Sequence, residues 1–179
     1  SKPFMALGLG LVAAWLFARA MALPLSHDEH QFVAAGRLLA DLGLLPYRDF
    51  PYHHTPYLPL VYAAVFRLSD YSLLSARVVS VACALVTCGL LFLLVQKPLE
   101  HLGRRAQVLL GAGGIILFVS NPIVAYTSGR SWNHDLPALF AFLAFVLRLH
   151  AESRSKPGLF HFLSGASIGL AAGTRLSYA

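Results

Sequence analysis

Charged residues are scarce in this sequence. Asp, Glu, Lys and Arg make up 12% of the 179 residues, whereas 57% of the residues are hydrophobic and the mean hydropathy is +0.64. A soluble domain of this length needs a larger polar fraction to cover its surface. The composition therefore predicts an all-α fold, a polytopic helical membrane protein with about five transmembrane helices, and leaves no room for a large soluble domain.

Cysteine is also scarce, and the charge carries no sign of a nucleic-acid partner. Cys83 and Cys88 lie in one apolar run and on different faces of an expected helix, so we expect no disulfide and interpret both as small core residues. The net charge of +6 comes from basic residues spread over loops and the ends of apolar segments. The positive-inside bias of membrane proteins accounts for that distribution, so we expect a lipid bilayer and no nucleic acid as a partner.

Five apolar segments are the expected spans of a single transmembrane module covering residues 1–179: 4–25, 73–96, 106–125, 136–149 and 159–176. The first segment could instead be a secretory signal peptide, because the small residues around Ala20 resemble a cleavage site. We interpret it as a span, and Lys2 before it predicts a cytoplasmic N-terminus. The glycines at 165, 169 and 173 predict close helix packing of the last span.

This orientation places two loops outside, residues 26–72 and 126–136. Ser26 and Glu29 form a capping box that opens a short amphipathic surface helix ending at Gly43. Residues 56–68 are apolar but too short to cross unless the bilayer is thinned, so two topologies stay open. The positive-inside bias favours a second interfacial helix, because the basic residues Lys97, Arg104, Arg105, Arg148, Arg154 and Lys156 then lie in the cytoplasm.

The same orientation brings three distant carboxylates to one side of the membrane. Asp28 and Glu29 lie in the first turn of the surface helix, where free N–H groups and the helix dipole favour ionised carboxylates. Asp135 precedes the fourth span and, with Pro137 after it, also suits a helix start. Each carboxylate has a capping role as an alternative to a catalytic one, and Asp28 is the best candidate for a general base.

Basic and imidazole groups accompany these carboxylates. Arg19, Arg77 and Arg175 lie near the outer ends of spans, and Arg130 lies in the second outer loop. Such arginines either pair with outer carboxylates or bind an anionic lipid head group. Five histidines, at 27, 30, 53, 54 and 134, also fall outside, but their spacing is not diagnostic of a metal site. We therefore expect no cofactor, with a divalent metal as an alternative.

Several motifs, in order, resemble one family. The Asp28-Glu29 pair, LPYRDFPYHHTPYLPL, the span beginning near Arg77, NPIVAYTSGRSWNHDLPALFAFLAF and GLAAGTRLS are similar to the N-terminal module of integral-membrane glycosyltransferases that use polyprenyl-phosphate sugars. These enzymes share the C-type glycosyltransferase fold and include the protein O-mannosyltransferases and the lipid A aminoarabinose transferases. The resemblance covers essentially the whole chain, through the order and spacing of the motifs.

The resemblance implies an inverting transfer of a sugar from a polyprenyl-phosphate donor to a hydroxyl of a lipid, glycan or protein acceptor, at the outer face of a bacterial inner membrane. It implies catalytic roles for Asp28, with Glu29 beside it, and Asp135, and it places Arg175 where relatives often have Lys. From their charge and position near the outer ends, we expect Arg77, Arg130 and Arg175 to bind the phosphate. The Lys-Pro pair common in relatives is replaced by Thr55-Pro56, so phosphate contact passes to an arginine or to His53 and His54. Relatives are longer, so the chain is expected to be a fragment that is not necessarily active alone.

Two other function classes stay open. A transporter fragment or assembly scaffold without enzymatic activity predicts arginines that face a path between the spans. An outer-face metal-binding protein predicts a cluster of the outer histidines with a carboxylate.

Overall fold

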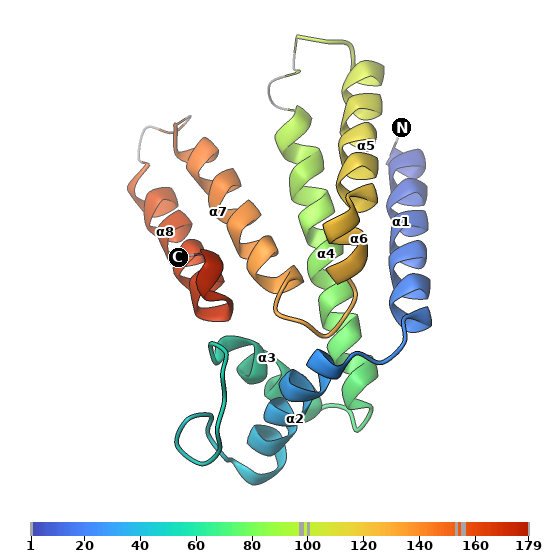
Figure 1. Ribbon diagram of the computed structural model, residues 1–179. Coiled ribbons are helices and arrows are strands. Elements are labelled where there is room, and N and C mark those ends of the chain that lie inside the picture. The colour runs from blue at the N-terminus through green and yellow to red at the C-terminus, as the bar shows by residue number, and fades with distance from the viewer. Residues whose placement is uncertain (1, 97–98, 100, 153, 155–156, 179) are drawn as a thin grey trace.

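The computed structural model describes residues 2–96, 99, 101–152, 154 and 157–178, and this part of the chain is helical (Figure 1). Its helices are α1 (Lys2–Ala22), α2 (His27–Leu42), α3 (Tyr57–Phe66), α4 (Ser72–Gln96), α5 (Arg104–Ser120), α6 (Pro122–Thr127), α7 (Asp135–Glu152) and α8 (Gly158–Thr174), followed by a 3-10 turn at Leu176–Tyr178. The described backbone has no strand, only an isolated bridge between Pro46 and Phe50. The all-α class is confirmed. Lys97 and Lys156, expected in the cytoplasm, lie outside the described residues.

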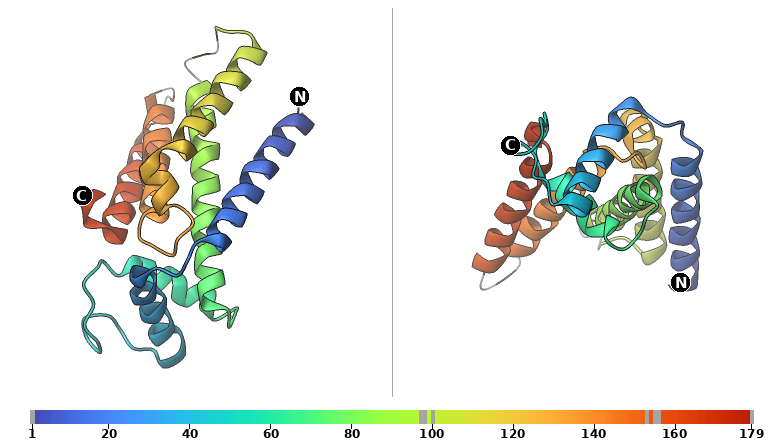
Figure 2. Two further views of the ribbon diagram at one scale, coloured as in Figure 1. Left: turned by 45° about the vertical axis from the view of Figure 1, so that its right-hand side comes forward. Right: turned by 90° about the horizontal axis from the view of Figure 1, so that it is seen from below.

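The long helices run side by side, and two shorter helices lie across one end of the bundle. Figures 1 and 2 show α1, α4, α5, α7 and α8 aligned along one direction, with α2 and α3 gathered at the end where α1 finishes and α7 begins. α4 is central, because it contacts α1, α5 and α7, whereas α8 packs on α7. The expected pair of helices in the first loop is present as α2 and α3.

Only one described helix is long and apolar enough to cross a membrane by itself. Residues 72–95 of α4 have a mean hydropathy of 2.8. Residues 10–22 of α1 and the helix α2 are apolar and long enough only when taken together, and the chain bends by 98° at the break between them. The expectation of about five spans is therefore not supported. Three of the other expected spans are too short or too charged to meet this criterion. α5 and α8 have 17 residues each, and the 18 residues of α7 include Asp135, Arg148 and Glu152.

The local signals place the helix ends where the sequence predicts them, with one exception. The Glu29 carboxylate accepts the N–H of Ser26 at 3.0 Å, as a capping box requires, and Gly43 ends α2 with a left-handed φ of 66°. The expected span at 106–125 is broken at Asn121. Pro122 disfavours helical backbone at the residue before it, and the Asn121 side chain accepts the N–H of Ile123 to start α6 afresh.

The largest core cluster lies at the junction between the surface helices and the bundle. It contains Phe32 and Ala35 of α2, Tyr62 and Phe66 of α3, and Trp132. Higher in the bundle the apolar side chains are largely exposed, including Leu93 at 58%, Leu109 at 72% and Phe162 at 71%. The buried core therefore supports the end of the bundle that carries the polar loops.

The glycine series of α8 contributes to packing at one position only. A Cβ added at Gly173 would lie 2.2 Å from the ring of Tyr57, so α3 and α8 approach each other closely there. At Gly165 and Gly169 an added Cβ would meet no described atom within 4 Å. The predicted packing of the last span is therefore confirmed, because α8 packs on α7 and α3, but of these three glycines only Gly173 lies at a close approach.

Candidate functional site

A buried ion pair fixes the end of the bundle where the polar loops meet. Arg77 of α4 donates from Nε to Glu29 Oε1 at 3.0 Å and from Nη2 to Oε2 at 2.8 Å, and both side chains are buried. Its Nη1 also donates to the carbonyls of Ala20 and Leu23 at the end of α1. One guanidinium group thus joins α1, α2 and α4 through charge-assisted hydrogen bonds.

The same carboxylate also holds the loop between α6 and α7. Glu29 Oε1 accepts the backbone N–H and the hydroxyl of Ser131, both at 2.9 Å. Burial alone raises the pKa of Glu29, but the hydrogen bonds from Arg77, Ser131 and Ser26 outweigh it and lower the pKa to about 2. Glu29 is therefore ionised at neutral pH, and both oxygens are occupied by protein donors.

Asp28, next in the chain to Glu29, is on the outside of the same turn. Its side chain is 60% exposed, and its Oδ1 lies 3.9 Å from Nδ1 of His27, which forms an ion pair with it only when the ring is protonated. Its charge acts on both His54 and His134, where it favours the protonated ring. Asp28 is thus the predicted carboxylate that is open to a ligand while facing imidazole groups from two other loops.

The loop of residues 43–56 brings His54 to this position. Tyr47 turns the loop with a left-handed φ of 68°, and its hydroxyl donates to the carbonyl of His54. The His54 ring lies 4.9 Å from the ring of Phe32 and 5.9 Å from that of Tyr52. Burial among these aromatic rings lowers the pKa of His54, and Asp28 opposes that shift. His53, the preceding residue, is exposed.

His134 and Arg175 join the site from the other end of the sequence. Nη1 of Arg175 lies 2.5 Å from Nδ1 and 2.8 Å from Nε2 of His134. Burial and the positive charge of Arg175 lower the pKa of His134 to about 4, with Asp28 opposing. His134 is therefore neutral at pH 7 and can accept a hydrogen bond from Arg175.

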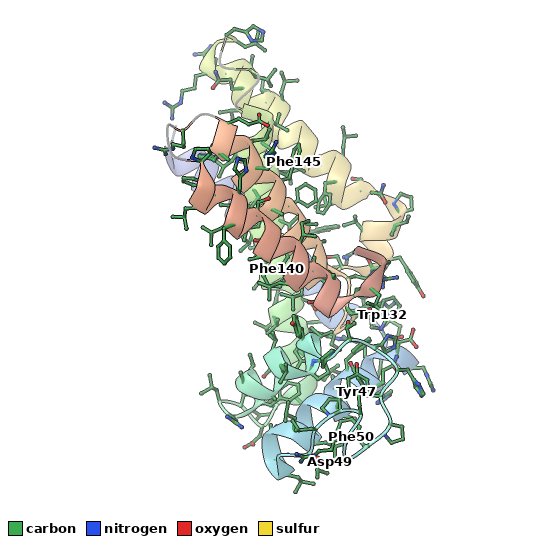
Figure 3. All side chains as sticks on the ribbon, turned by 90° about the vertical axis from the view of Figure 1, so that its left-hand side faces the viewer. Tyr47, Asp49, Phe50, Trp132, Phe140 and Phe145 are labelled. Atoms are coloured by element: carbon green, nitrogen blue, oxygen red, sulfur yellow. The ribbon has the colours of Figure 1, made fainter. Side chains whose placement is uncertain are left out.

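Arg130 and Asp135, both predicted for the site, are turned inward. Arg130 is 9% exposed, donates to the carbonyls of Tyr126 and Pro24, and lies over the rings of Tyr126 and Trp132. In Figure 3, Trp132 lies between the bundle and the loop that carries Tyr47 and Phe50. Arg130 is therefore part of the wall of the site.

Asp135, the first residue of α7, is buried behind the same loop. Its Oδ2 accepts the N–H of Gly129 at 2.9 Å. Gly129 has a φ of 81°, and a Cβ there would lie 2.8 Å from that of Ala20, so glycine is needed for this turn. Burial raises the pKa of Asp135 to about 7, against which the Gly129 hydrogen bond acts. Asp28 and Asp135 lie at one end of the bundle, but Asp28 is exposed and Asp135 is buried.

The predicted residues therefore have different places. The structure brings together Asp28, His54 and Arg175, whereas Glu29 and Arg77 form the buried frame. Arg130 and Asp135 are buried, and His53 is exposed. His134 was recognised only as an outer histidine, although its place between Trp132 and Asp135 in the sequence was a usable signal. We call Asp28, His54, His134 and Arg175 the outer cluster.

Several polar atoms beside the outer cluster lack partners. Within the described residues, the buried Tyr52 hydroxyl, Thr55 hydroxyl and Trp132 indole N–H have no hydrogen-bond partner. Such atoms need water or a ligand to offset their desolvation.

No group of three His, Cys, Asp or Glu side chains in the described part of the chain could hold a metal ion, so Asp28, His54 and His134 do not form such a group. The two cysteines are buried and free, as expected. Comparisons of the chain with protein-family models, curated proteins and solved structures gave no match.

Proposed function

We propose that this chain is the N-terminal membrane module of an inverting glycosyltransferase that takes a sugar from a polyprenyl-phosphate carrier. The observation that carries this proposal is the outer cluster itself. Four segments far apart in the sequence place a carboxylate, two imidazoles and a guanidinium at one end of an apolar bundle. Transfer of a sugar from a lipid-linked phosphate to a hydroxyl needs a base near the hydroxyl and a cation near the departing phosphate, both at the edge of a bilayer.

Membrane embedding is supported by where the apolar side chains lie. Only 33% of the apolar stretch of α4 is buried inside the molecule, although its hydropathy is 2.8. Large side chains such as Ile116, Leu117 and Phe145 are 55–76% exposed on α5 and α7. An apolar exterior of this extent suits lipid. At 17 residues, α5 and α8 are about 25 Å long, which is at the short end for a span, and we propose that they cross with α1, α4 and α7.

Arg175 is the proposed phosphate-binding group, and the charge of Arg175 acts on His54. His53 and His54 are the further candidates for phosphate contact. Among the described residues, His134 is the hydrogen-bond partner of the Arg175 side chain, and it is neutral, so it does not cancel the guanidinium charge. A phosphate can therefore attract Arg175 without competing with a carboxylate for it. Arg130 and Arg77 support the site through the loop and the buried frame.

Asp28 is the proposed general base. The acceptor hydroxyl attacks the anomeric carbon, its oxygen forms the new glycosidic bond with inversion, and its proton passes to the Asp28 carboxylate. The bond between the anomeric carbon and the phosphate oxygen breaks, and the electron pair leaves with the polyprenyl phosphate, whose charge Arg175 stabilises. A lipid, glycan or protein supplies the hydroxyl, and no cofactor takes part.

The arginines favour this proposal over a transporter path. Arg77 binds the carbonyls of residues 20 and 23, Arg130 that of Pro24, and Arg19 that of Ser128, so all three gather at the outer end of the bundle. A transporter fragment predicts charges distributed along a path between the spans.

The test is sugar transfer by membranes that contain the protein, from a panel of polyprenyl-phosphate sugars. Asp28→Asn should lower the rate at least about 100-fold, the lower end of what a general base contributes. Asp41→Asn is the matched control, because Asp41 is an exposed carboxylate on the same helix, 56% exposed and paired with Arg37. Equal rates for the two variants would refute the role of Asp28.

A further inference from the structure

A groove lies on the side of the bundle away from the outer cluster. It runs between α1 and the α5–α6 junction, has a volume of about 580 Å³, and is lined by Leu11, Trp15, Arg19, Val119 and Ala125 among others. Figures 1 and 2 show α1 and α5 side by side, with α8 at the opposite edge of the bundle. The groove is therefore separate from the proposed transfer site.

The two ends of the groove differ in polarity. Its walls are apolar along Leu11, Val12 and Val119. Its polar lining residues are Ser120 at the end of α5 and Arg19 in the last turn of α1, of which Arg19 carries a charge. Trp15, one turn earlier, is 47% exposed and lies 5.2 Å from the Arg19 guanidinium. Tryptophan is enriched at the level of lipid head groups. The groove thus runs from an interfacial end at Arg19 to an apolar end within the bundle.

Arg19 keeps its positive charge at that end. Its Nη1 and Nη2 donate to the backbone carbonyls of Ala125 and Ser128, which are neutral acceptors. Among the described residues, Asp135 is the carboxylate whose charge acts on Arg19, and it does so through space. The Arg19 residue is half-buried and lines the groove, and its Nε is buried with no hydrogen-bond partner among the described residues. An arginine at this depth attracts an anionic head group, and the apolar walls suit an acyl chain.

We propose that this groove binds an anionic phospholipid of the bilayer, with the phosphate at Arg19 and one acyl chain along Leu11, Val12 and Val119. Binding here requires the bundle to be embedded in a membrane, but it does not require sugar transfer.

Photo-crosslinking from a residue of the groove tests the proposal. Val119→benzoylphenylalanine places the probe in the groove, and Ile116→benzoylphenylalanine is the control, because Ile116 is 61% exposed on the same helix and does not line the groove. The full chain is reconstituted in nanodiscs of equal phosphatidylglycerol and phosphatidylcholine, and the lipid adducts are identified by mass spectrometry. At position 119 the phosphatidylglycerol adduct should exceed the phosphatidylcholine adduct about fivefold, and at position 116 the two should be equal.

The charge of Arg19 is tested in the same background. Arg19→Gln should bring the adduct ratio at position 119 to one, and Arg19→Lys should retain most of the preference. Equal ratios at positions 119 and 116 in the chain with Arg19 intact overturn the proposal, and that comparison does not depend on how the Arg19 variants fold. A preference that survives Arg19→Gln also overturns it. Loss of transfer in Asp28→Asn leaves all these ratios unchanged.

Discussion

Replacing Glu29 with Gln distinguishes a frame residue from a catalytic one. Glu29 is fully buried and bound by Arg77 through two charge-assisted hydrogen bonds. Removing one partner of such a pair leaves the other charge buried and costs about 3–5 kcal/mol. The pKa gives a similar size, since a value of about 2 in place of 4.5 corresponds to about 3 kcal/mol of stability at neutral pH. For a chain of this length, Tm should fall by about 6–20 °C.

The sign of the pH dependence follows from the lowered pKa. A carboxyl group with a lowered pKa stabilises the folded state above its ordinary pKa, and that contribution is lost as the pH falls toward the folded value. The Tm difference between the wild-type chain and Glu29→Gln should therefore be constant above about pH 5 and shrink between about pH 4.5 and pH 2. Thermal unfolding in detergent, followed by size-exclusion chromatography, measures it.

The control is Glu152→Gln, which removes an exposed partner. Glu152 lies 3.8 Å from Arg148, and both side chains are more than half exposed, so the variant should change stability by less than about 0.5 kcal/mol. If Glu29→Gln unfolds at the same temperature as Glu152→Gln, the frame role of Glu29 is wrong. A variant that keeps its Tm but loses transfer would place Glu29 in the reaction instead.

Two further substitutions test the geometry. Burial raises the pKa of Asp135 to about 7 in place of 3.8, so the folded state loses up to about 4 kcal/mol of stability as the pH rises between those values. Asp135→Asn should therefore raise Tm more at about pH 8 than at about pH 4. An equal effect at both pH values would contradict the buried, protonated carboxyl group. Gly173→Ala should lower the free energy of unfolding by about 1–3 kcal/mol, because the added Cβ meets the ring of Tyr57. The control is Gly169→Ala on the same helix, which adds a Cβ in open space and should be neutral or stabilising. Equal effects of the two variants would show that α3 and α8 are not in close contact at Gly173.

The helices could be predicted because their signals are local. The apolar runs, the capping box at Ser26 and the left-handed Gly43 place most helix ends within a few residues of the structure. The interruption at Asn121 was missed because hydropathy does not change there, although Pro122 marks it. The number of spans could not be fixed from composition, because 17-residue apolar helices lie at the lower limit for crossing a bilayer.

The site was harder to predict because side-chain direction depends on long-range packing. Asp28 and Glu29 are adjacent in the sequence, yet one is exposed and the other is buried with Arg77, 48 residues away. The pairing of Arg175 with His134 likewise depends on the end of α8 reaching the loop before α7. Charge and hydropathy predicted that these residues share one end of the bundle, but they could not show which of them face outward.

The most direct measurement of the central claim is the accessibility of single cysteines to a membrane-impermeant maleimide in intact cells. His27 and Leu176 are exposed at the two ends of the sequence that meet at the outer cluster, and His101 is exposed in the loop between α4 and α5. Cys83 and Cys88 are buried and should give no background. We expect His27→Cys and Leu176→Cys to label in intact cells, and His101→Cys to label only after the cells are permeabilised. Labelling of position 101 from outside, or of positions 27 and 176 from opposite sides, would contradict the account.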